Sequence, residues 1–280
     1  MEILCDLHTH SVYSDGTYTP AQILQEASRI GLGAVALTDH NTVAGLPVFL
    51  KEAEKYDIEP VCGVEFSTNY EGKELHLLGL FLSPEQFPAV TEMLMDGVRA
   101  KRESNRKLAE GLAAAGYPVD YEAMLKKSPN GQLNRANFAA ELVRLGYMES
   151  IQQAFKSVLS EDYGIYRAPK WVDVMDAIRF VCDLGAVPVI AHPFLDLKTM
   201  PAVRSFLEKA KPEGLLGMEV YHPKHTFEQR QQALELAKEF HLLPSGGSDF
   251  HGENKPDISL GSGRGDLAVP MSFCSALRPE

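Results

Sequence analysis

Two histidines near the start of the chain stand one residue apart, in the run Asp6-Leu7-His8-Thr9-His10. They directly follow a short apolar run, Ile3-Leu4-Cys5. If that run is a strand, His8 and His10 point to the same face, because strand side chains alternate with a period of two. Two neighbouring imidazoles form half of a metal site, although an isolated pair of this kind is a weak signal. The pair gains meaning only if the rest of the chain supplies matching ligands.

Further metal-binding side chains lie close to other apolar runs, mostly at their ends: Asp15, His40, Glu65, His76, His192, Asp249 and His251. Each of them alone has an ordinary explanation. Asp15-Gly16 is typical of a turn, Asp39-His40 of a helix cap, and His76 of a hydrogen-bonded core histidine. All nine placements together are hard to attribute to chance. The set therefore predicts a centre that binds metal through imidazole nitrogens and carboxylate oxygens.

The elements that must position these residues alternate along the chain. Seven apolar runs read as strands, and most intervals between them carry helical periodicity. The runs are 3–5, 34–37, 59–64, 75–81, 186–190, 215–220 and 242–247. This order predicts an α/β fold with a largely parallel sheet. The ligand clusters fall where a (β/α) barrel keeps its catalytic groups. A doubly wound open sheet is the alternative, but ligands on nearly every strand favour a closed ring over a single switch point.

The segment 98–168 differs from its flanks. It is helical in pattern, highly charged, and contains neither a histidine nor a strand–helix alternation. We expect 1–97 and 169–280 to form the barrel domain and 98–168 to form a small all-helical insertion domain.

Composition limits the classes of partner. The formal net charge of −11 argues against a long nucleic acid as an obligate partner, since such surfaces need basic tracts. The start has no signal-peptide pattern, and no apolar run approaches the ~18 residues that span a bilayer. The four cysteines are scattered without a CxxC pair, which is typical of reduced thiols. We expect a cytoplasmic protein without membrane attachment, and no obligate protein partner is evident.

Taken in order, six motifs resemble the polymerase-and-histidinol-phosphatase (PHP) family of metal-dependent phosphoesterases. They are DLHTHSVYSDGTYTP, ALTDHNTVAG, GVEFS, ELHLLG, IAHP and GSDFHG. The resemblance covers both flanks of the insertion. It implies a distorted (β/α)7 barrel with a small all-helical insertion, and a centre of two or three divalent metal ions.

Position by position, the resemblance implies three metal sites. His8, His10, Glu65 and Asp249 would hold the first, with Glu65 bridging to the second. His76 and His192 would complete the second, and Asp15, His40 and His251 would hold the third. Many relatives have a histidine where this chain has Asp15. The carboxylate makes the third site richer in oxygen, which favours manganese, with iron or zinc as alternatives.

Such a centre suits hydrolysis of a phosphoester. Divalent ions outweigh the charge of the three carboxylates and would attract a phosphate despite the acidic chain. Metal-activated hydroxide, its pKa lowered towards ~7, can attack phosphorus without a covalent nucleophile. Glu65 and Asp249 are the catalytic candidates among the ligands. His225, in Tyr221-His222-Pro223-Lys224-His225, is a further candidate to contact the reacting phosphate or donate a proton.

The insertion resembles that of the nucleoside 3′,5′-bisphosphate phosphatase group. This resemblance implies a small phosphorylated nucleotide as substrate, cleaved at its 3′-phosphate, with the other phosphate held by Arg102, Asn134 and Arg135. An arginine fork suits phosphate because it donates two parallel hydrogen bonds. Three alternatives stay open: a 5′→3′ exonuclease on short oligonucleotides, a histidinol-phosphate-type phosphatase, and a nucleotide-sensing module without turnover.

Overall fold

The computed structural model describes residues 3–128 and 133–279. It divides the chain into two compact units. Residues up to Leu94 and from Val172 onward form the first unit, and Met95–Trp171 form the second. Each unit is described by itself.

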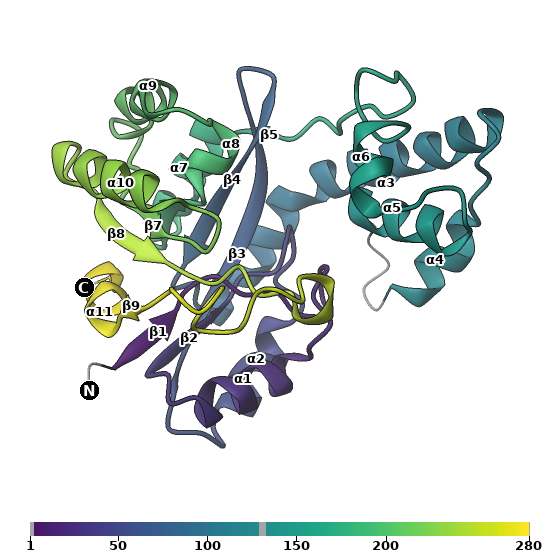
Figure 1. Cartoon of the computed structure of the whole chain (residues 1–280). Coiled ribbons are helices and arrows are strands. Elements are labelled where there is room, and N and C mark those ends of the chain that lie inside the picture. The colour runs from purple at the N-terminus through teal and green to yellow at the C-terminus, as the bar shows by residue number, and fades with distance from the viewer. Residues whose placement is uncertain (1–2, 129–132, 280) are drawn as a thin grey trace. The chain divides into compact units, whose positions relative to one another are not determined.

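The first unit is built on a nine-stranded sheet in the order β8-β7-β6-β4-β3-β2-β1-β9, with β5 beside β3 (Figure 1). The strands are β1 (Leu4–Asp6), β2 (Ala34–Leu37), β3 (Glu59–Tyr70), β4 (Lys73–Leu80), β5 (Val172–Asp173), β6 (Val187–Ile190), β7 (Gly217–Tyr221), β8 (Leu243–Gly246) and β9 (Val269–Pro270). The α/β barrel expected from the sequence is confirmed, and the seven predicted strands correspond to β1–β4 and β6–β8.

The prediction of a largely parallel sheet was wrong in its centre. β4 runs antiparallel to both β3 and β6, and β9 runs antiparallel to β1. The cause is a two-residue hairpin at Glu71-Gly72, where both residues have positive φ (52° and 81°). That conformation matches a type I′ turn, whose twist joins neighbouring antiparallel strands. The sheet is therefore a mixed, nearly closed barrel.

The ring closes where the ends of β1 and β8 meet. The Leu7 N–H donates to the Gly246 carbonyl at 3.1 Å, and the His10 N–H donates to the Phe250 carbonyl at 2.9 Å. Inside, the buried core includes Leu7, which directly follows β1, together with Ala36, Leu78 and Val189 from β2, β4 and β6. The residues that follow β1 and β8 are thus held side by side although they are about 240 positions apart in sequence.

Helices cover this sheet (Figure 1). They are α1 (Pro20–Arg29), α2 (Leu46–Ala53), α7 (Val174–Asp183), α8 (Pro193–Asp196), α9 (Met200–Ala210), α10 (Phe227–Glu239) and α11 (Met271–Leu277), with short 3₁₀ turns at Pro84–Gln86 and Gly252–Asn254. α1 begins as its sequence predicts. The Thr19 hydroxyl caps Gln22 N–H, Pro20 takes the first helical position, and Gly31 follows the end with φ of +77°.

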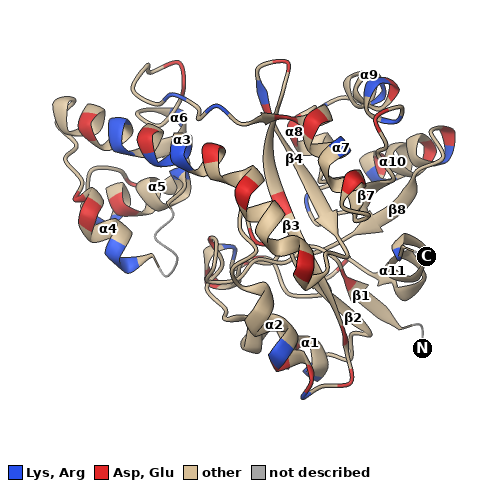
Figure 2. Ribbon diagram, turned by 180° about the vertical axis from the view of Figure 1, so that it is seen from behind, with Lys and Arg blue, Asp and Glu red and all other residues tan. Residues whose placement is uncertain are grey.

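The second unit is helical. α3 (Phe87–Ala114) begins in the first unit and continues into the second, which also contains α4 (Tyr121–Lys127), α5 (Arg135–Arg144) and α6 (Ile151–Lys156). Its own core includes Leu108, Leu112, Phe138 and Leu142, all fully buried. Both α3 and α4 carry acidic and basic residues (Figure 2). No helix among residues 3–128 and 133–279 is long and apolar enough to cross a membrane.

Candidate metal centre

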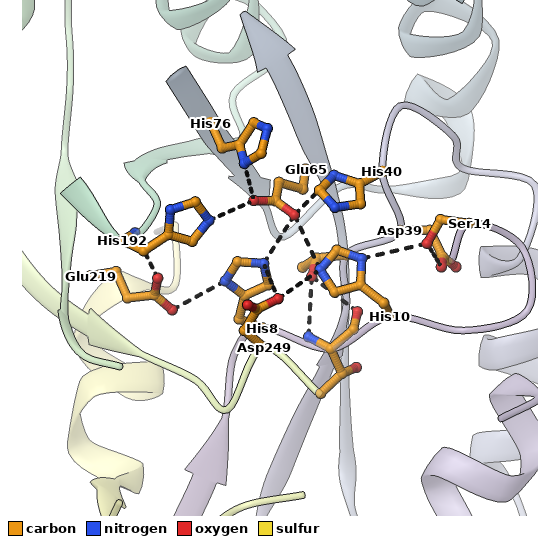
Figure 3. A network of polar contacts seen from close by, with 12 residues as sticks. His8, His10, Ser14, Asp39, His40, Glu65, His76, His192, Glu219 and Asp249 are labelled. Carbon is orange, nitrogen blue, oxygen red and sulfur yellow. Dashed lines mark hydrogen bonds and ion pairs between the residues drawn. The ribbon is translucent and has the colours of Figure 1, made fainter. Parts of the chain in front are cut away.

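Glu65 lies at the centre of a ring of five imidazoles. It projects from the middle of β3, fully buried. Its two oxygens face different groups of histidines (Figure 3). Oε2 is 3.1 Å from each of His8 Nε2, His10 Nε2 and His40 Nδ1, while Oε1 is 3.2 Å from His76 Nδ1 and 3.1 Å from His192 Nε2. One carboxylate is therefore placed to serve two ions, one on each oxygen.

Asp249 completes one side of this arrangement. It follows β8, where the barrel closes, and its backbone N–H donates to the His8 carbonyl at 2.9 Å. Its Oδ1 is 3.4 Å from His10 Nε2 and 3.8 Å from His8 Nε2. Asp249 has a φ of 54°, a conformation that non-glycine residues seldom adopt. The surrounding contacts hold the carboxylate toward the histidines that follow β1 against that strain.

Asp15, in the loop after β1, lies close to two further histidines. Its Oδ1 is 3.1 Å from His251 Nε2, and its Oδ2 is 3.9 Å from His40 Nε2. Four overlapping sets of side chains have ligand atoms close enough together to share an ion: His10 with Asp15, His40 and His251; His8 with His10 and Asp249; His8 with Glu65 and His192; and His76 with His192 and Asp196. All nine residues singled out from the sequence fall in these sets, and the structure brings them to one end of the barrel.

The donor set fits divalent metal ions. The buried nitrogens His8 Nε2, His10 Nε2, His40 Nδ1 and His76 Nδ1 face Glu65, yet among the described residues none has a hydrogen-bond partner. Buried polar atoms are rarely left unpaired in folded proteins, and a cation between nitrogen and carboxylate oxygen satisfies both. Imidazole with carboxylate suits zinc, iron and manganese. The buried clusters are thus consistent with a multi-metal centre.

Electrostatics within the cluster keep the carboxylates ionised. Burial disfavours the charge on Glu65, but His40, His8 and His76 hold its pKa well below the ordinary value. At His40, burial is the largest influence and lowers the pKa of the imidazole to about 3. At His192, Asp196 and Glu65 overcome burial and raise the pKa to about 9. The metal-free centre therefore keeps negative charge where cations would bind.

A family model described as "PHP domain" matches residues 6–163. The chain belongs to the PHP family. It is a metal-dependent phosphoesterase, a hydrolase acting on phosphoester bonds. This assignment agrees with the histidine and carboxylate centre at the mouth of its barrel.

PHP relatives match nearly the whole chain. A 5′-3′ exoribonuclease from Haemophilus influenzae is 35% identical over 88% of this chain and 89% of its own length. A phosphoribosyl 1,2-cyclic phosphate 1,2-diphosphodiesterase from Eggerthella lenta is 32% identical over 89% and 94%. A 3′,5′-nucleoside bisphosphate phosphatase from Chromobacterium violaceum is 28% identical over 90% of each chain. A crystal structure described as a metal-dependent phosphoesterase from Bifidobacterium adolescentis has a TM-score of 0.85 at 27% identity, covering 98% of this chain and 94% of that one.

Three carboxylates that were not predicted from the sequence support this PHP centre. Glu219 Oε1 is 3.2 Å from His8 Nδ1, and Asp196 Oδ2 is 3.2 Å from His192 Nδ1. Asp39 accepts from the hydroxyls of Ser11 and Ser14 at 2.7 and 2.6 Å. Two signals were present in the sequence. Glu219 is a lone acid inside an apolar strand, and Asp196 stands four residues after His192, one helical turn away.

Lys255 was missed as well. Its ammonium is 2.6 Å from Asp249 Oδ2, on the side of that carboxylate turned away from His10. The proximity of Lys255, followed by His251, holds the pKa of Asp249 well below its ordinary value despite burial. The side chain is partly exposed, so this cation borders the metal centre and remains in contact with solvent.

His225 is buried beside the centre. Its Nδ1 faces the Val220 carbonyl at 3.1 Å, and its ring packs against Phe194 and His222. Burial lowers its pKa to about 4, so the ring is neutral at pH 7. Because the Nδ1–H donates a hydrogen bond to the Val220 carbonyl, the lone pair of the neutral ring lies on Nε2. In this state Nε2 can accept a hydrogen bond but has no proton to donate, so the structure does not favour the predicted role of His225 as a proton donor.

The three predicted substrate residues of the insertion lie in the second unit. Arg102 is exposed on α3 and lines a small pocket with Lys101, Asn105 and Tyr121. The guanidinium of Arg135 stacks on the Tyr166 ring, 4.3 Å from its centroid. Asn134 caps α5, because its side-chain oxygen accepts from the Asn137 N–H at 3.0 Å.

Proposed function

We propose that this PHP phosphoesterase degrades short 5′-phosphorylated oligonucleotides, RNA above all, from the 5′ end and releases 5′-mononucleotides. The observation that carries the proposal is the 35% identity to a 5′-3′ exoribonuclease over almost the full length of both proteins. The similarity includes the insertion as well as the metal-binding flanks. The sequence analysis ranked this activity second, behind removal of the 3′-phosphate from a nucleoside 3′,5′-bisphosphate.

Bisphosphate hydrolysis is the second candidate, supported by the 28% identical bisphosphate phosphatase. The two reactions break the same kind of bond. In each, the oxygen of water adds to phosphorus, the bond from phosphorus to O3′ breaks, and O3′ takes a proton. The first nucleotide leaves as a 5′-monophosphate in both cases. The other product is inorganic phosphate in one reaction and a shortened 5′-phosphorylated chain in the other, so one site is suited to both.

The geometry around Glu65 supports an assignment of ligands to separate ions. We propose that His8, His10, Glu65 and Asp249 hold one ion, that Glu65, His76 and His192 hold a second, and that Asp15, His40 and His251 hold a third. When bound, such ions lower the pKa of a water molecule and neutralise the leaving oxygen. Manganese is our preferred metal, because Asp15 adds a hard oxygen ligand. In this proposal Glu65 sets the spacing of the first two sites, and His225, which packs against His222, would contact the reacting phosphate.

We propose that the insertion recognises the 5′-phosphate of the substrate. The resemblance seen in the sequence assigns this role to Arg102, Asn134 and Arg135. Stacking on Tyr166 holds the Arg135 guanidinium in one plane and leaves its edge able to donate two parallel hydrogen bonds. Recognition of a terminal phosphate explains how cleavage begins at the 5′ end.

A substrate panel tests the proposal. Manganese-supplemented protein is given a 5′-phosphorylated pentaribonucleotide, the same chain with a 5′-hydroxyl, adenosine 3′,5′-bisphosphate and histidinol phosphate. We expect stepwise release of 5′-mononucleotides from the first substrate, slower reaction of the second, and some release of phosphate from the bisphosphate. Turnover of histidinol phosphate alone, or internal cleavage of the chain, would overturn the assignment.

Arg135→Ala tests the role of the insertion, with Arg144→Ala on the same helix as its control. Arg144 pairs with Glu141 at 2.6 Å on the exposed side of α5. Loss of a phosphate-binding arginine should raise KM for the pentaribonucleotide about tenfold or more, which corresponds to ~1.4 kcal/mol or more. Hydrolysis of p-nitrophenyl phosphate, which lacks a second phosphate, should stay unchanged. Equal KM values for Arg135→Ala and Arg144→Ala would remove Arg135 from the binding site.

A further inference from the structure

A single buried carboxylate connects the two groups of histidines that face Glu65. Glu219 projects from β7 and is fully buried. Its Oε1 is 3.2 Å from His8 Nδ1, and its Oε2 accepts the His192 backbone N–H at 2.8 Å (Figure 3). The rings of His8 and His192 lie parallel, 5.7 Å apart. Each oxygen of Glu219 is therefore engaged by a different histidine.

The contact with His8 selects a tautomer. Because Glu219 is an acceptor, His8 Nδ1 must carry the proton, and the lone pair of the neutral ring then lies on Nε2. That nitrogen faces Glu65 Oε2 at 3.1 Å and has no hydrogen bond among the described residues. The other tautomer would place a proton on the nitrogen that faces the ion.

The contact with His192 fixes the backbone. His192 lies between β6 and α8, at the N-cap of α8, and has a φ of 25°, outside the usual conformations of a non-glycine residue. The hydrogen bond from its N–H to Glu219 holds this turn. Through the turn, His192 Nε2 comes within 3.1 Å of Glu65 Oε1, on the side of Glu65 opposite to His8.

We propose that Glu219 is a positioning residue that sets His8 and His192 for two different metal ions at once. The proposal rests on the metal ligands given under the proposed function, but not on the identity of the substrate. It requires both oxygens of Glu219 to accept. A glutamine has one acceptor oxygen and one donor group, so Glu219→Gln can satisfy His192 N–H or His8 Nδ1–H, but not both.

Asp196 supplies a matched comparison. It also contacts a ligand histidine, with Oδ2 3.2 Å from His192 Nδ1. Asp196→Asn removes the same charge and makes the same change of carboxylate to amide. Its remaining carbonyl oxygen can still accept from Nδ1, because only one donor is involved. The two variants therefore separate loss of charge from loss of a second acceptor.

The experiment measures metal binding directly. Wild type, Glu219→Gln and Asp196→Asn are prepared metal-free, and manganese affinity is measured by competition with a chelator. The visible absorption of bound cobalt is recorded as well, because it reports the ligand geometry. We expect Glu219→Gln to bind manganese roughly 10–100-fold more weakly, with an altered cobalt spectrum. Asp196→Asn, which changes a contact of one ligand histidine only, should lose less manganese affinity than Glu219→Gln and keep a cobalt spectrum closer to that of the wild type. Melting of the metal-free proteins shows whether each variant is folded.

Wild-type affinity in Glu219→Gln would overturn the proposal, and so would equal losses in the two variants. If Glu219→Gln does not fold, nitrogen-15 spectra of zinc-loaded wild type decide the question. They should show His8 protonated at Nδ1 and metal-bound at Nε2, and the reverse assignment would overturn it. None of these readouts uses a nucleotide, so metal binding without nuclease activity would count against the proposed function alone.

Discussion

At the scale of single residues, the site depends on how Glu65 divides its contacts. Three imidazole nitrogens face one of its oxygens and two face the other, all within 3.2 Å. A fully buried carboxylate with no fixed positive charge in contact is costly, because ionised groups need compensation in a low-dielectric interior. Metal ions supply that compensation on both sides. Glu65 is therefore the residue whose change should disturb the most of the centre.

Glu65→Gln keeps the size of the side chain but removes its charge and one acceptor oxygen. We expect phosphoester turnover to fall by about 100-fold or more, equivalent to about 2.7 kcal/mol or more, because two ions lose a shared ligand. The measurement is initial rate together with metal content. Glu71→Gln is the control, since Glu71 lies in the turn between β3 and β4 and pairs with Lys209 at the surface. Near-normal turnover with full metal content in Glu65→Gln would contradict the bridging role.

At the scale of elements, the centre depends on the close approach of β1 and β8. The two strands carry His8, His10 and Asp249 into contact where the barrel closes. Gly247 makes this approach possible, because a Cβ there would lie 2.4 Å from His8 Cβ and 2.5 Å from His8 N. The backbone of His8 cannot yield without moving its side chain.

Gly247→Ala should therefore push the ends of β1 and β8 apart. We expect a loss of about 1–3 kcal/mol in the free energy of unfolding, as for overpacked cores, together with weaker metal binding. Chemical denaturation and chelator competition measure the two effects. Ser245→Ala on β8 is the control, because its buried hydroxyl has no hydrogen-bond partner among the described residues. Unchanged stability and metal affinity in Gly247→Ala would show that the ring does not depend on this contact.

These elements were largely predictable from the sequence, for a physical reason. Buried strands read as apolar runs, and a ligand interrupts or ends each run. The same rule caused the main error. The run 59–64 was predicted to end at Glu65, whereas β3 continues to Tyr70. Glu65 and Ser67 point to one face of the strand, and the buried residues Phe66 and Thr68 point to the other. A polar face inside a long strand looks like a strand end.

The supporting residues were harder to predict because their roles depend on contacts distant in sequence. Glu219 meets His8 across 211 positions, and although it is a lone acid inside an apolar strand, nothing local indicates which histidine it contacts. Lys255 belongs to no ligand-type pattern, and only the fold brings it to Asp249. The sequence could identify metal-binding residues by type and order, but not the groups that orient them.

At the scale of the whole molecule, the candidate metal ligands and the candidate phosphate-binding residues lie in different units. All nine candidate metal ligands lie in the first unit, whereas the second has a separate helical core and carries the candidate phosphate-binding arginines. Binding of a metal stabilises only the structure that contains its ligands. The units should therefore respond differently to metal.

Removal of metal should loosen the first unit selectively. At a metal concentration 100-fold above Kd, the expected stabilisation is about 2.7 kcal/mol for one site. We expect chelation to increase hydrogen exchange in β1, β3, β4 and β8 and to leave residues 95–128 and 133–171 unchanged. Exchange followed by mass spectrometry compares the two states peptide by peptide. Equal changes in both units would show that metal acts on the chain as a whole.

The most direct test of the account is the position of metal relative to Glu65. Anomalous diffraction from a manganese-loaded crystal, collected on both sides of the manganese edge, locates each ion. The account predicts at least two peaks that share Glu65, one with His8, His10 and Asp249 and the other with His76 and His192. A single ion, or ions that leave Glu65 without a metal contact, would contradict it.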